Sequence, residues 1–353
     1  MRNCFDSIGP TTVRTGDPDN GRLVLGLISW PGRRVWVSGG LGFIGSNLSL
    51  RLLELGAQVT VVDLCGPGCG GDEENLSPHG EKFRIIRCNI GDAETFAEEL
   101  AETDVVFNLA GEISHARSMR EPMRDLELNT IAQLRFLEVL TRVRPGIRVV
   151  YAGTRQVYGR AKMLPVNEDH PIRPTDYNGA HKRAAENYHL MLKRMGRLDA
   201  VVLRLTNTYG PRLSLTATGQ GFLSVFLKRA LEGEPITVFG DGTQTRDPVY
   251  VDDVVDAFLA VGAAQEAKFG VYNIGGPESL TVYEIARTVA EAAGSSEKIL
   301  LRPFPPEHKA VDLGSYTADT SRIREEFGWT PRVAFAEGIR ETLAWYAARM
   351  ATR

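Results

Sequence analysis

Short apolar runs alternate with amphipathic stretches along the first two thirds of this chain, and this alternation constrains the fold more than any other feature. Helical spacing marks stretches such as 43–55 and 129–141. The runs between them are typical of buried strands, at 35–38, 59–62, 83–86, 105–109, 149–152 and 201–205. Because parallel strands need helical connections and are covered on both faces, the sequence predicts an α/β fold with a doubly wound parallel sheet.

Two regions depart from this alternation. Residues 1–32 mix polar residues with proline and glycine and show no sustained period, so we expect an extension outside the fold. Toward the C-terminus, frequent glycines and prolines interrupt shorter elements, which predicts a smaller, irregular lobe at 206–248 and 277–353. The segment near 249–276 ends in an apolar run, and we expect it to return to the main sheet.

Charge and cysteine content exclude several classes of partner. With 41 basic and 44 acidic residues, a net charge of -3, nothing indicates a surface for nucleic acid or an anionic membrane. The apolar run 23–30 is far shorter than the ~20 residues that cross a bilayer, and it leads straight into the first strand, so we expect no signal peptide. Four cysteines are too few for a disulfide framework and lack the paired CxxC motifs of structural zinc. We expect no metal, reduced thiols in a cytoplasm, and a small-molecule partner.

A glycine-rich turn at Gly39, Gly42 and Gly45 follows the first predicted strand and opens the first predicted helix. Glycine permits close backbone approach, and the first amides of a helix attract a pyrophosphate. A tight turn without a ligand would carry the same glycines. However, Asp63 ends the second strand, where a carboxylate accepts hydrogen bonds from an adenosine ribose and repels a 2′-phosphate. The sequence therefore predicts a Rossmann-type domain at 33–205 that binds NAD rather than NADP.

The predicted NAD site extends over the carboxyl ends of several neighbouring strands, because these ends line the ligand crevice of a doubly wound sheet. We expect the following residues to contribute to it: Gly39, Gly42, Phe43, Ile44, Gly45, Asp63, Leu64, Asn89, Ile90, Leu109, Ala110 and Gly111.

Several longer motifs resemble those of one enzyme family. They are VSGGLGFIGSNL at 37–48, NLAG at 108–111, GTRQVYG at 153–159, KRAAE at 182–186, RLTNTYGPR at 204–212 and FGDGTQTRDPVYVDDVVDAF at 239–258. The chain, from Arg33 to about Pro331, is similar to the NAD-dependent nucleotide-sugar epimerases and dehydratases of the extended short-chain dehydrogenase/reductase group. This resemblance implies NAD as cofactor, a nucleotide-diphosphate sugar as substrate, and substrate binding by the smaller lobe.

The resemblance also implies roles for particular side chains. Lys182 would hold the nicotinamide ribose and lower the pKa of a neighbouring phenol. Thr154 would bind the sugar hydroxyl that is oxidised, although backbone groups could equally satisfy a hydroxyl at a strand end. Asn207 and Arg246 would bind the diphosphate. The other candidates for substrate contact are Gln156, Asn178, Phe222 and Lys309.

One departure from the family pattern concerns the acid–base tyrosine, which normally stands four residues before the lysine. Asn178 occupies that position, and Tyr177 precedes it. Since helix residues five apart differ in direction by about 140°, Tyr177 would point away from Lys182 in a regular helix. Three interpretations follow. Tyr177 precedes the first helical turn and reaches the site; or another group is the base, with His181, His115, Glu112 and Tyr158 as candidates; or the chain binds without catalysis. We favour Tyr177, with Thr154 and Lys182, as the catalytic set.

A second departure narrows the reaction. Where dehydratases of the family carry an acidic pair after the threonine, this chain has Arg155 and Gln156, neither of which can supply it. The decarboxylases of the family also use a glutamate at the second position. We therefore expect epimerisation, most simply at C4, with a dehydratase, decarboxylase or dehydrogenase using an atypical base as the alternative. Relatives pair through two helices, here about 120–143 and 179–195, so a homodimer is expected.

Overall fold

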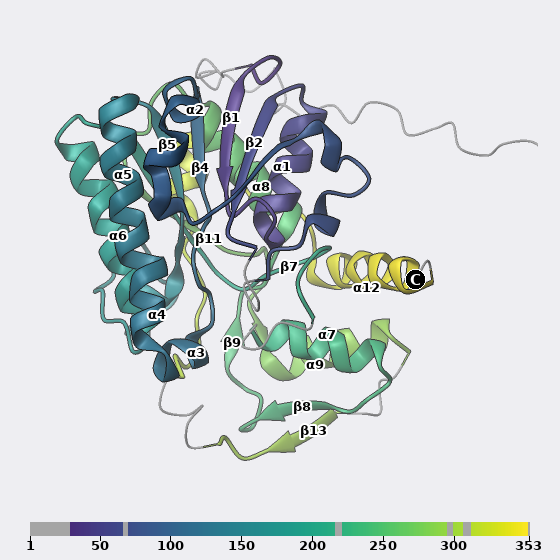
Figure 1. Ribbon diagram of the computed structural model, residues 1–353. Coiled ribbons are helices and arrows are strands. Elements are labelled where there is room, and N and C mark those ends of the chain that lie inside the picture. Colours follow the sequence, from purple (N-terminus) through teal and green to yellow (C-terminus); the bar gives the residue numbers. More distant parts are fainter. Residues whose placement is uncertain (1–28, 66–69, 216–220, 295–298, 306–311, 352–353) are drawn as a thin grey trace, which may run out of the picture.

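The computed structural model describes residues 29–65, 70–215, 221–294, 299–305 and 312–351 (Figure 1). Its main sheet contains seven parallel strands in the order β11-β6-β5-β4-β1-β2-β3. These strands are β1 (Arg34–Ser38), β2 (Gln58–Asp63), β3 (Arg84–Arg87), β4 (Val105–Asn108), β5 (Arg148–Thr154), β6 (Asp199–Leu205) and β11 (Val271–Ile274). The prediction of a doubly wound, Rossmann-type parallel sheet is confirmed.

Helices cover both faces of this sheet, because side chains along each strand point alternately to one face and the other. Val35 and Val37 pack on the face covered by α1 and α8, whereas Trp36 packs on the face covered by α2 and α5. The helices around the sheet are α1 (Phe43–Glu54), α2 (Ala97–Ala101), α3 (His115–Arg120), α4 (Pro122–Leu126), α5 (Ala132–Val143), α6 (Tyr177–Arg194), α8 (Val251–Ala263) and α11 (Ser321–Phe327).

The smaller lobe has its own hydrophobic core, in which Phe226, Val238, Val289 and Ile339 are buried. Thr281 and Glu284 form a capping box that fixes the start of α9. The elements of this lobe are α7 (Phe222–Leu231), β8 (Ile236–Phe239), α9 (Val282–Ala292), β13 (Ile299–Arg302) and α12 (Phe335–Ala351). Two short pairs, β7 (Thr208–Tyr209) with β10 (Val249–Tyr250) and β9 (Thr245–Arg246) with β12 (Leu280–Thr281), lie between this lobe and the sheet. None of the described helices is long and apolar enough to cross a membrane.

The N-terminal boundary differs from the expected one. Residues 1–28 lie outside the described residues, but Trp30 is only 8% exposed and belongs to the core beneath α8. Its ring centroid lies 6.0 Å from that of Phe107, and its carbonyl accepts a hydrogen bond from Arg33. The amide of Gly32 donates to the carbonyl of Gly56. The folded unit therefore begins before residue 33, because an aromatic side chain just upstream of β1 fills space under the sheet.

This packing makes Trp30 a stability determinant. Trp30→Ala should lower the free energy of unfolding by about 3–5 kcal/mol, because it leaves a cavity beside Phe107. Trp30→Phe should cost less, since it keeps an aromatic ring. Denaturant unfolding followed by circular dichroism measures both values. Met163→Ala, at a side chain that is 67% exposed, is the control and should change stability by no more than about 0.5 kcal/mol. Equal stability of Trp30→Ala and this control would contradict the assignment.

Candidate active site

The turn between β1 and α1 packs tightly against the end of β4. Gly39 has a φ of +73°, and a Cβ atom there would lie 2.8 Å from the carbonyl carbon of Leu109. A Cβ atom on Gly45 would overlap the carbonyl oxygen of Gly39. The N-cap of α1 is Gly42, which has no side chain to bind the first amides of the helix. The turn thus fits the pyrophosphate of a dinucleotide, because its backbone is accessible and its helix N-terminus is open to an anion.

Asp63 ties the end of β2 to this turn. Its carboxylate accepts hydrogen bonds from the amides of Leu41 and Cys65, each at 3.1 Å. Burial raises the pKa of Asp63, while these backbone hydrogen bonds oppose the rise. The next residue, Leu64, is exposed at the rim. A carboxylate fixed beside the glycine turn has the chemistry that binds ribose hydroxyls.

The other predicted cofactor residues follow β3 and β4. Asn89 accepts a hydrogen bond from the amide of Gly91 at 2.8 Å, and Ile90 next to it is buried. The amide of Leu109 bonds to Ser38 of β1, and the carbonyl of Ala110 accepts a hydrogen bond from Gln133. Since β4, β1, β2 and β3 are neighbours and parallel, their carboxyl ends meet at one edge of the sheet. The structure therefore brings this predicted set together.

Lys182 lies on α6 and is buried next to the loop that follows β4. A Cβ atom on Gly111 would lie 2.5 Å from Asn129 Oδ1 and 3.2 Å from Lys182 Nζ, so this glycine packs closely against both side chains. Burial lowers the pKa of Lys182, whereas the carboxylates of Asp125 and Glu112 favour its charged form. The position is suited to holding hydroxyl groups at the edge of the cofactor site.

Asn178, not a tyrosine, fills the space on the same side of α6. It is 1% exposed, and its amide group donates to the carbonyl of Glu112 at 2.8 Å and to Asp125 Oδ2 at 3.0 Å. Both of its donors are thereby used within the protein. Its oxygen cannot remove a proton from a sugar hydroxyl.

Tyr177 does not precede the first turn of α6, as we expected, but is the first residue of the helix. Asp176 is the N-cap, so regular helical geometry holds from Tyr177 onward. The ring of Tyr177 stacks against His181 with a centroid distance of 6.0 Å, and the side chain is exposed. Because Lys182 is five residues further on, the phenol and the ammonium lie on different sides of the helix. The proximity expected between Tyr177 and Lys182 is therefore wrong.

Thr154 ends β5 next to a cluster of polar residues. Its hydroxyl oxygen accepts a hydrogen bond from the amide of Gln156 at 3.1 Å. The side chain of Gln156 is buried and donates to Asp176 Oδ2 at 2.6 Å. His115 Nδ1 lies 3.0 Å from the same carboxylate oxygen. The structure thus connects the end of β5 with the beginnings of α3 and α6.

A second cluster joins the sheet to the smaller lobe through two arginines. Arg155 Nη2 donates to Asn207 Oδ1 at 3.1 Å, and its guanidinium lies over the ring of Tyr316. Arg246 donates to the carbonyls of Thr245 and Gly314. Among the described residues, Arg155 Nη1 and Arg246 Nε are buried without a hydrogen-bond partner. Two cations with buried, unpaired donor atoms are suited to an anionic ligand group.

Asp247 lies in the same cluster and is 1% exposed. Its Oδ2 accepts a hydrogen bond from the amide of Ala318 at 2.8 Å, while Oδ1 has no partner among the described residues. Burial raises the pKa of Asp247 to about 7, although Arg155 and Arg246 favour the ionised form. Burial likewise lowers the pKa of Arg246 to about 10, helped by repulsion from Arg155. Asp312 also faces this cluster, with its Oδ1 3.7 Å from Arg246 Nη2, so two carboxylates lie beside the two arginines.

The remaining predicted contacts are less informative. Phe222 begins α7 and packs edge-on against Phe226 with a centroid distance of 5.3 Å, so the core of the smaller lobe accounts for it in part. Lys309 lies outside the described residues. No group of three or more His, Cys, Asp or Glu residues suited to a metal ion occurs in the described part of the chain.

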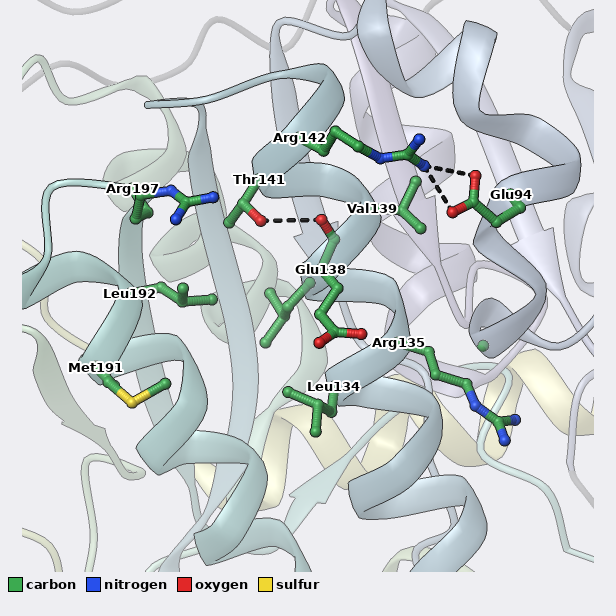
Figure 2. Close-up of a pocket in the computed structure, with 12 residues that line it drawn as sticks. Glu94, Leu134, Arg135, Glu138, Val139, Thr141, Arg142, Met191, Leu192 and Arg197 are labelled. Carbon is green, nitrogen blue, oxygen red and sulfur yellow. Dashed lines mark hydrogen bonds and ion pairs between the residues drawn. The ribbon is translucent and has the colours of Figure 1, made fainter.

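A hollow of about 580 Å³ lies on another part of the surface, between α5 and α6 (Figure 2). Its lining includes Leu134, Glu138 and Met191, and Arg142 pairs with Glu94 at its rim. None of the predicted site residues lines it. The hollow instead lies on the two helices through which a dimer is expected.

Comparison with known proteins gives the family. Residues 35–275 match the NAD dependent epimerase/dehydratase family. The chain belongs to this family. NAD is accordingly the cofactor, and the glycine turn described above fits it.

The relatives carry out different reactions. The chain is 35% identical over 321 residues to a UDP-glucose 4-epimerase of Mycolicibacterium smegmatis, an alignment covering 89% of this chain and 98% of the relative. It is 32% identical to UDP-glucuronic acid decarboxylase 1 of Danio rerio, covering 89% and 73% of the two chains. The structure of a UDP-glucose 4-epimerase of Thermotoga maritima with UDP-glucose has a TM-score of 0.81 and 32% identity, covering 90% of this chain and 99% of that one. The family is clear, while these relatives span more than one reaction.

Sequence reasoning missed the two clusters around Asp176 and Asp247. The sequence indicates His115 as a candidate base but does not indicate its pairing with Asp176. Asp176 could have been found as a helix cap, because an aspartate directly before an amphipathic stretch is a typical N-cap. The sequence gives no comparable sign of the contacts between Arg155 and Asn207, which are 52 positions apart.

The glycine turn yields a binding prediction. Gly45→Ala should weaken NAD binding at least roughly tenfold, or about 1.4 kcal/mol, because the new Cβ would displace the carbonyl of Gly39. Titration calorimetry measures the affinity. Gly80→Ala is the matched control, since a Cβ there meets nothing within 4 Å, and it should bind NAD like the wild type. Unchanged affinity of Gly45→Ala would contradict the proposed contact with the turn.

Asp247 yields a pH prediction. Its pKa in the folded state, about 7, lies above the ordinary value of 3.8, so folding retains a proton that the unfolded chain has lost. Wild-type stability should therefore fall as pH rises from 5 to 8, and Asp247→Asn should not share this loss. The stability of the variant relative to wild type should rise by about 2 kcal/mol over this range.

Denaturant unfolding at both pH values measures the difference. Asp241→Asn serves as the control because Asp241 is exposed and its hydrogen bonds from Thr243 lower its pKa. That control should show no such rise. A pH-independent difference between Asp247→Asn and wild type would mean that the carboxyl group is already ionised in the folded protein.

Proposed function

We propose that this chain is an NAD-dependent epimerase that inverts C4 of a nucleotide-diphosphate sugar through a transient keto-sugar. The observation that carries the proposal is that the two residues after Thr154 are not acidic and hydrogen-bond to other side chains of the protein. Arg155 binds Asn207, and Gln156 binds Asp176. Removal of water needs an acid and a base at this end of β5, and neither side chain supplies them. Epimerisation requires no such pair.

NAD held at this site would supply reversible hydride transfer, so that epimerisation would involve no net oxidation. The glycine turn and Asp63 would hold the cofactor, and Lys182 would bind the hydroxyls of its nicotinamide ribose. Thr154 would donate to the reacting sugar oxygen, since its own oxygen already accepts from Gln156 and its hydrogen remains available. These roles are supported by the convergence of β4, β5 and α6 at one edge of the sheet.

The diphosphate would bind at the two buried arginines. Arg155 Nη1 and Arg246 Nε are the donors that lack partners in the described residues, and Asn207 lies beside Arg155. An anion would satisfy both donors and offset the repulsion between the two guanidinium groups. The UDP-glucose bound in the Thermotoga maritima epimerase carries such a diphosphate.

One observation favours a different function. The phenol that normally stands at position 178 is replaced by an amide with both donors occupied. A protein that binds NAD and a sugar nucleotide without turnover would tolerate this replacement. The assay below separates the two functions.

We also propose a cytoplasmic homodimer. The described cysteines, Cys65 and Cys88, are both free, which suits a reducing compartment. Met191 is exposed on α6 beside the hollow between α5 and α6, where a second copy could cover it. Such a face would use the same surface on both subunits.

The test is turnover on a panel of UDP-, dTDP-, GDP-, CDP- and ADP-sugars. We expect one or more of them to equilibrate with the C4 epimer, without net NADH and without release of water or carbon dioxide. Nuclear magnetic resonance of the products and NADH absorbance measure these outcomes. Lys182→Met should bind the sugar nucleotide but lose turnover.

Net NADH would identify a dehydrogenase instead, and release of water or carbon dioxide would identify a lyase. Binding of both ligands with no reaction on any sugar would favour the non-catalytic function.

A further inference from the structure

The missing phenol raises the question of which group moves the proton in the proposed epimerisation. Two of the candidate bases indicated by the sequence, Glu112 and Tyr158, are unsuited to this role in the structure. Glu112 accepts hydrogen bonds from the amides of Ile113 and Ser114 and from Arg117. Tyr158 is fully buried, and burial raises its pKa to about 12. Neither group is free to accept a proton from a sugar.

His115 differs from these two groups because its side chain is partly exposed. It begins α3, immediately after the loop that follows β4, and α3 packs against α4 and α6. Figure 1 shows α3 beyond the carboxyl ends of the strands, near the start of α6. Its side chain is 39% exposed, so the ring is accessible from the solvent side. The position is therefore at the edge of the sheet where the reacting sugar is expected.

A buried carboxylate contacts one nitrogen of this ring. Asp176 Oδ2 lies 3.0 Å from His115 Nδ1, and this buried nitrogen makes no well-aligned hydrogen bond to any described residue. Asp176 is itself held by Gln156 at 2.6 Å and by the amide of Gly179 at 2.7 Å. Burial alone would raise the pKa of Asp176, but His115 and these hydrogen bonds lower it overall. A fixed, ionised carboxylate at Nδ1 favours the tautomer that leaves Nε2 free to accept a proton.

The chain of contacts ends at the residue that would bind the sugar. Gln156 joins Asp176 to Thr154, because its side chain binds the former and its amide binds the latter. A second histidine–aspartate pair, His181 with Asp125, has a similar separation of 2.7 Å but lacks this connection. Asp125 instead binds Asn178, and the ring of His181 stacks on Tyr177. The two pairs therefore differ in their relation to β5.

We propose that His115, positioned by Asp176, is the acid–base residue that replaces the missing phenol, an inference that rests on the epimerase function proposed above. The O–H bond of the sugar hydroxyl breaks and its proton bonds to Nε2 of His115, while the hydride on the same carbon passes to NAD. The keto-sugar then rotates within the site. The same hydride returns to the opposite face of the sugar, and His115 gives the proton back. Protons and electrons balance over the cycle, and both the ring and the cofactor are restored.

His115→Gln should lower kcat by roughly 100-fold or more, with little change in KM for the sugar nucleotide. His181→Gln is the matched control, because it makes the same change in the other histidine–aspartate pair, and it should keep most of the activity. Added imidazole should restore part of the turnover of His115→Ala, which loss of a merely structural contact would not allow. Thermal unfolding of each variant checks that the fold is retained.

Asp176→Asn tests the positioning role separately. Asparagine caps a helix as well as aspartate does, so α6 should remain intact. Loss of the negative charge should lower kcat with little change in KM for the sugar nucleotide, because the ring loses the carboxylate that orients it. Other charged groups on α3 and on the adjoining ends of α4 and α6 remain unchanged in this variant: Arg117, Arg120, Arg124, Asp125, His181 and Lys182.

The outcomes distinguish the two proposals. Wild-type epimerisation together with full activity of His115→Gln would overturn the role of His115 and leave the epimerase function standing. Equal losses in His115→Gln and His181→Gln, without rescue by imidazole, would also overturn it. Absence of wild-type turnover on every sugar would overturn the epimerase function, and the role of His115 with it.

Discussion

The close contact between the glycine turn and the end of β4 is the constraint on which the arrangement of the site depends. Gly39 meets the backbone of Leu109, and Gly45 meets Gly39, so β1, α1 and β4 share one tightly packed junction. Asp63 adds the end of β2 through its hydrogen bond from Leu41. Because this junction uses backbone rather than side chains, it leaves a surface open at the edge of the sheet. Everything that would contact the nicotinamide and the sugar is placed relative to that edge.

Local signals in the sequence were sufficient to predict the sheet and NAD as the cofactor. Strand runs, the glycine turn and Asp63 are each recognisable within a short window, since their structural cause is the periodicity or the conformational freedom of neighbouring residues. The residues proposed for the NAD site could therefore be chosen from short stretches of sequence, and the structure places them at one edge of the sheet. Trp30 was missed for the opposite reason. Its burial depends on Phe107, far away in the sequence, and its own neighbourhood is rich in residues typical of loops.

The polar clusters were even harder to predict, because they too depend on residues far apart in the sequence. Helical geometry correctly indicated that Tyr177 would face away from Lys182, but our preference for an irregular first turn was wrong because Asp176 caps a regular helix. Arg155 has two neighbours from other elements, Asn207 and Asp247. No short sequence motif predicts these contacts. What the sequence did supply was the identity of unusual residues, Asn178 and Arg155 among them. The structure showed which partners these residues bind, and these partners indicate what each residue does in the site.

Asp176 combines two tasks that proteins often give to separate residues. The same carboxylate closes the first turn of α6 and holds both Gln156 and His115. Fraying of this turn would therefore release the ring and the amide together, as one cooperative unit. Hydrogen exchange at the backbone amide of Gly179 should therefore report on the ordering of the His115 side chain as well as on the stability of the helix. In this architecture, helix capping and the ordering of the catalytic side chains are a single event.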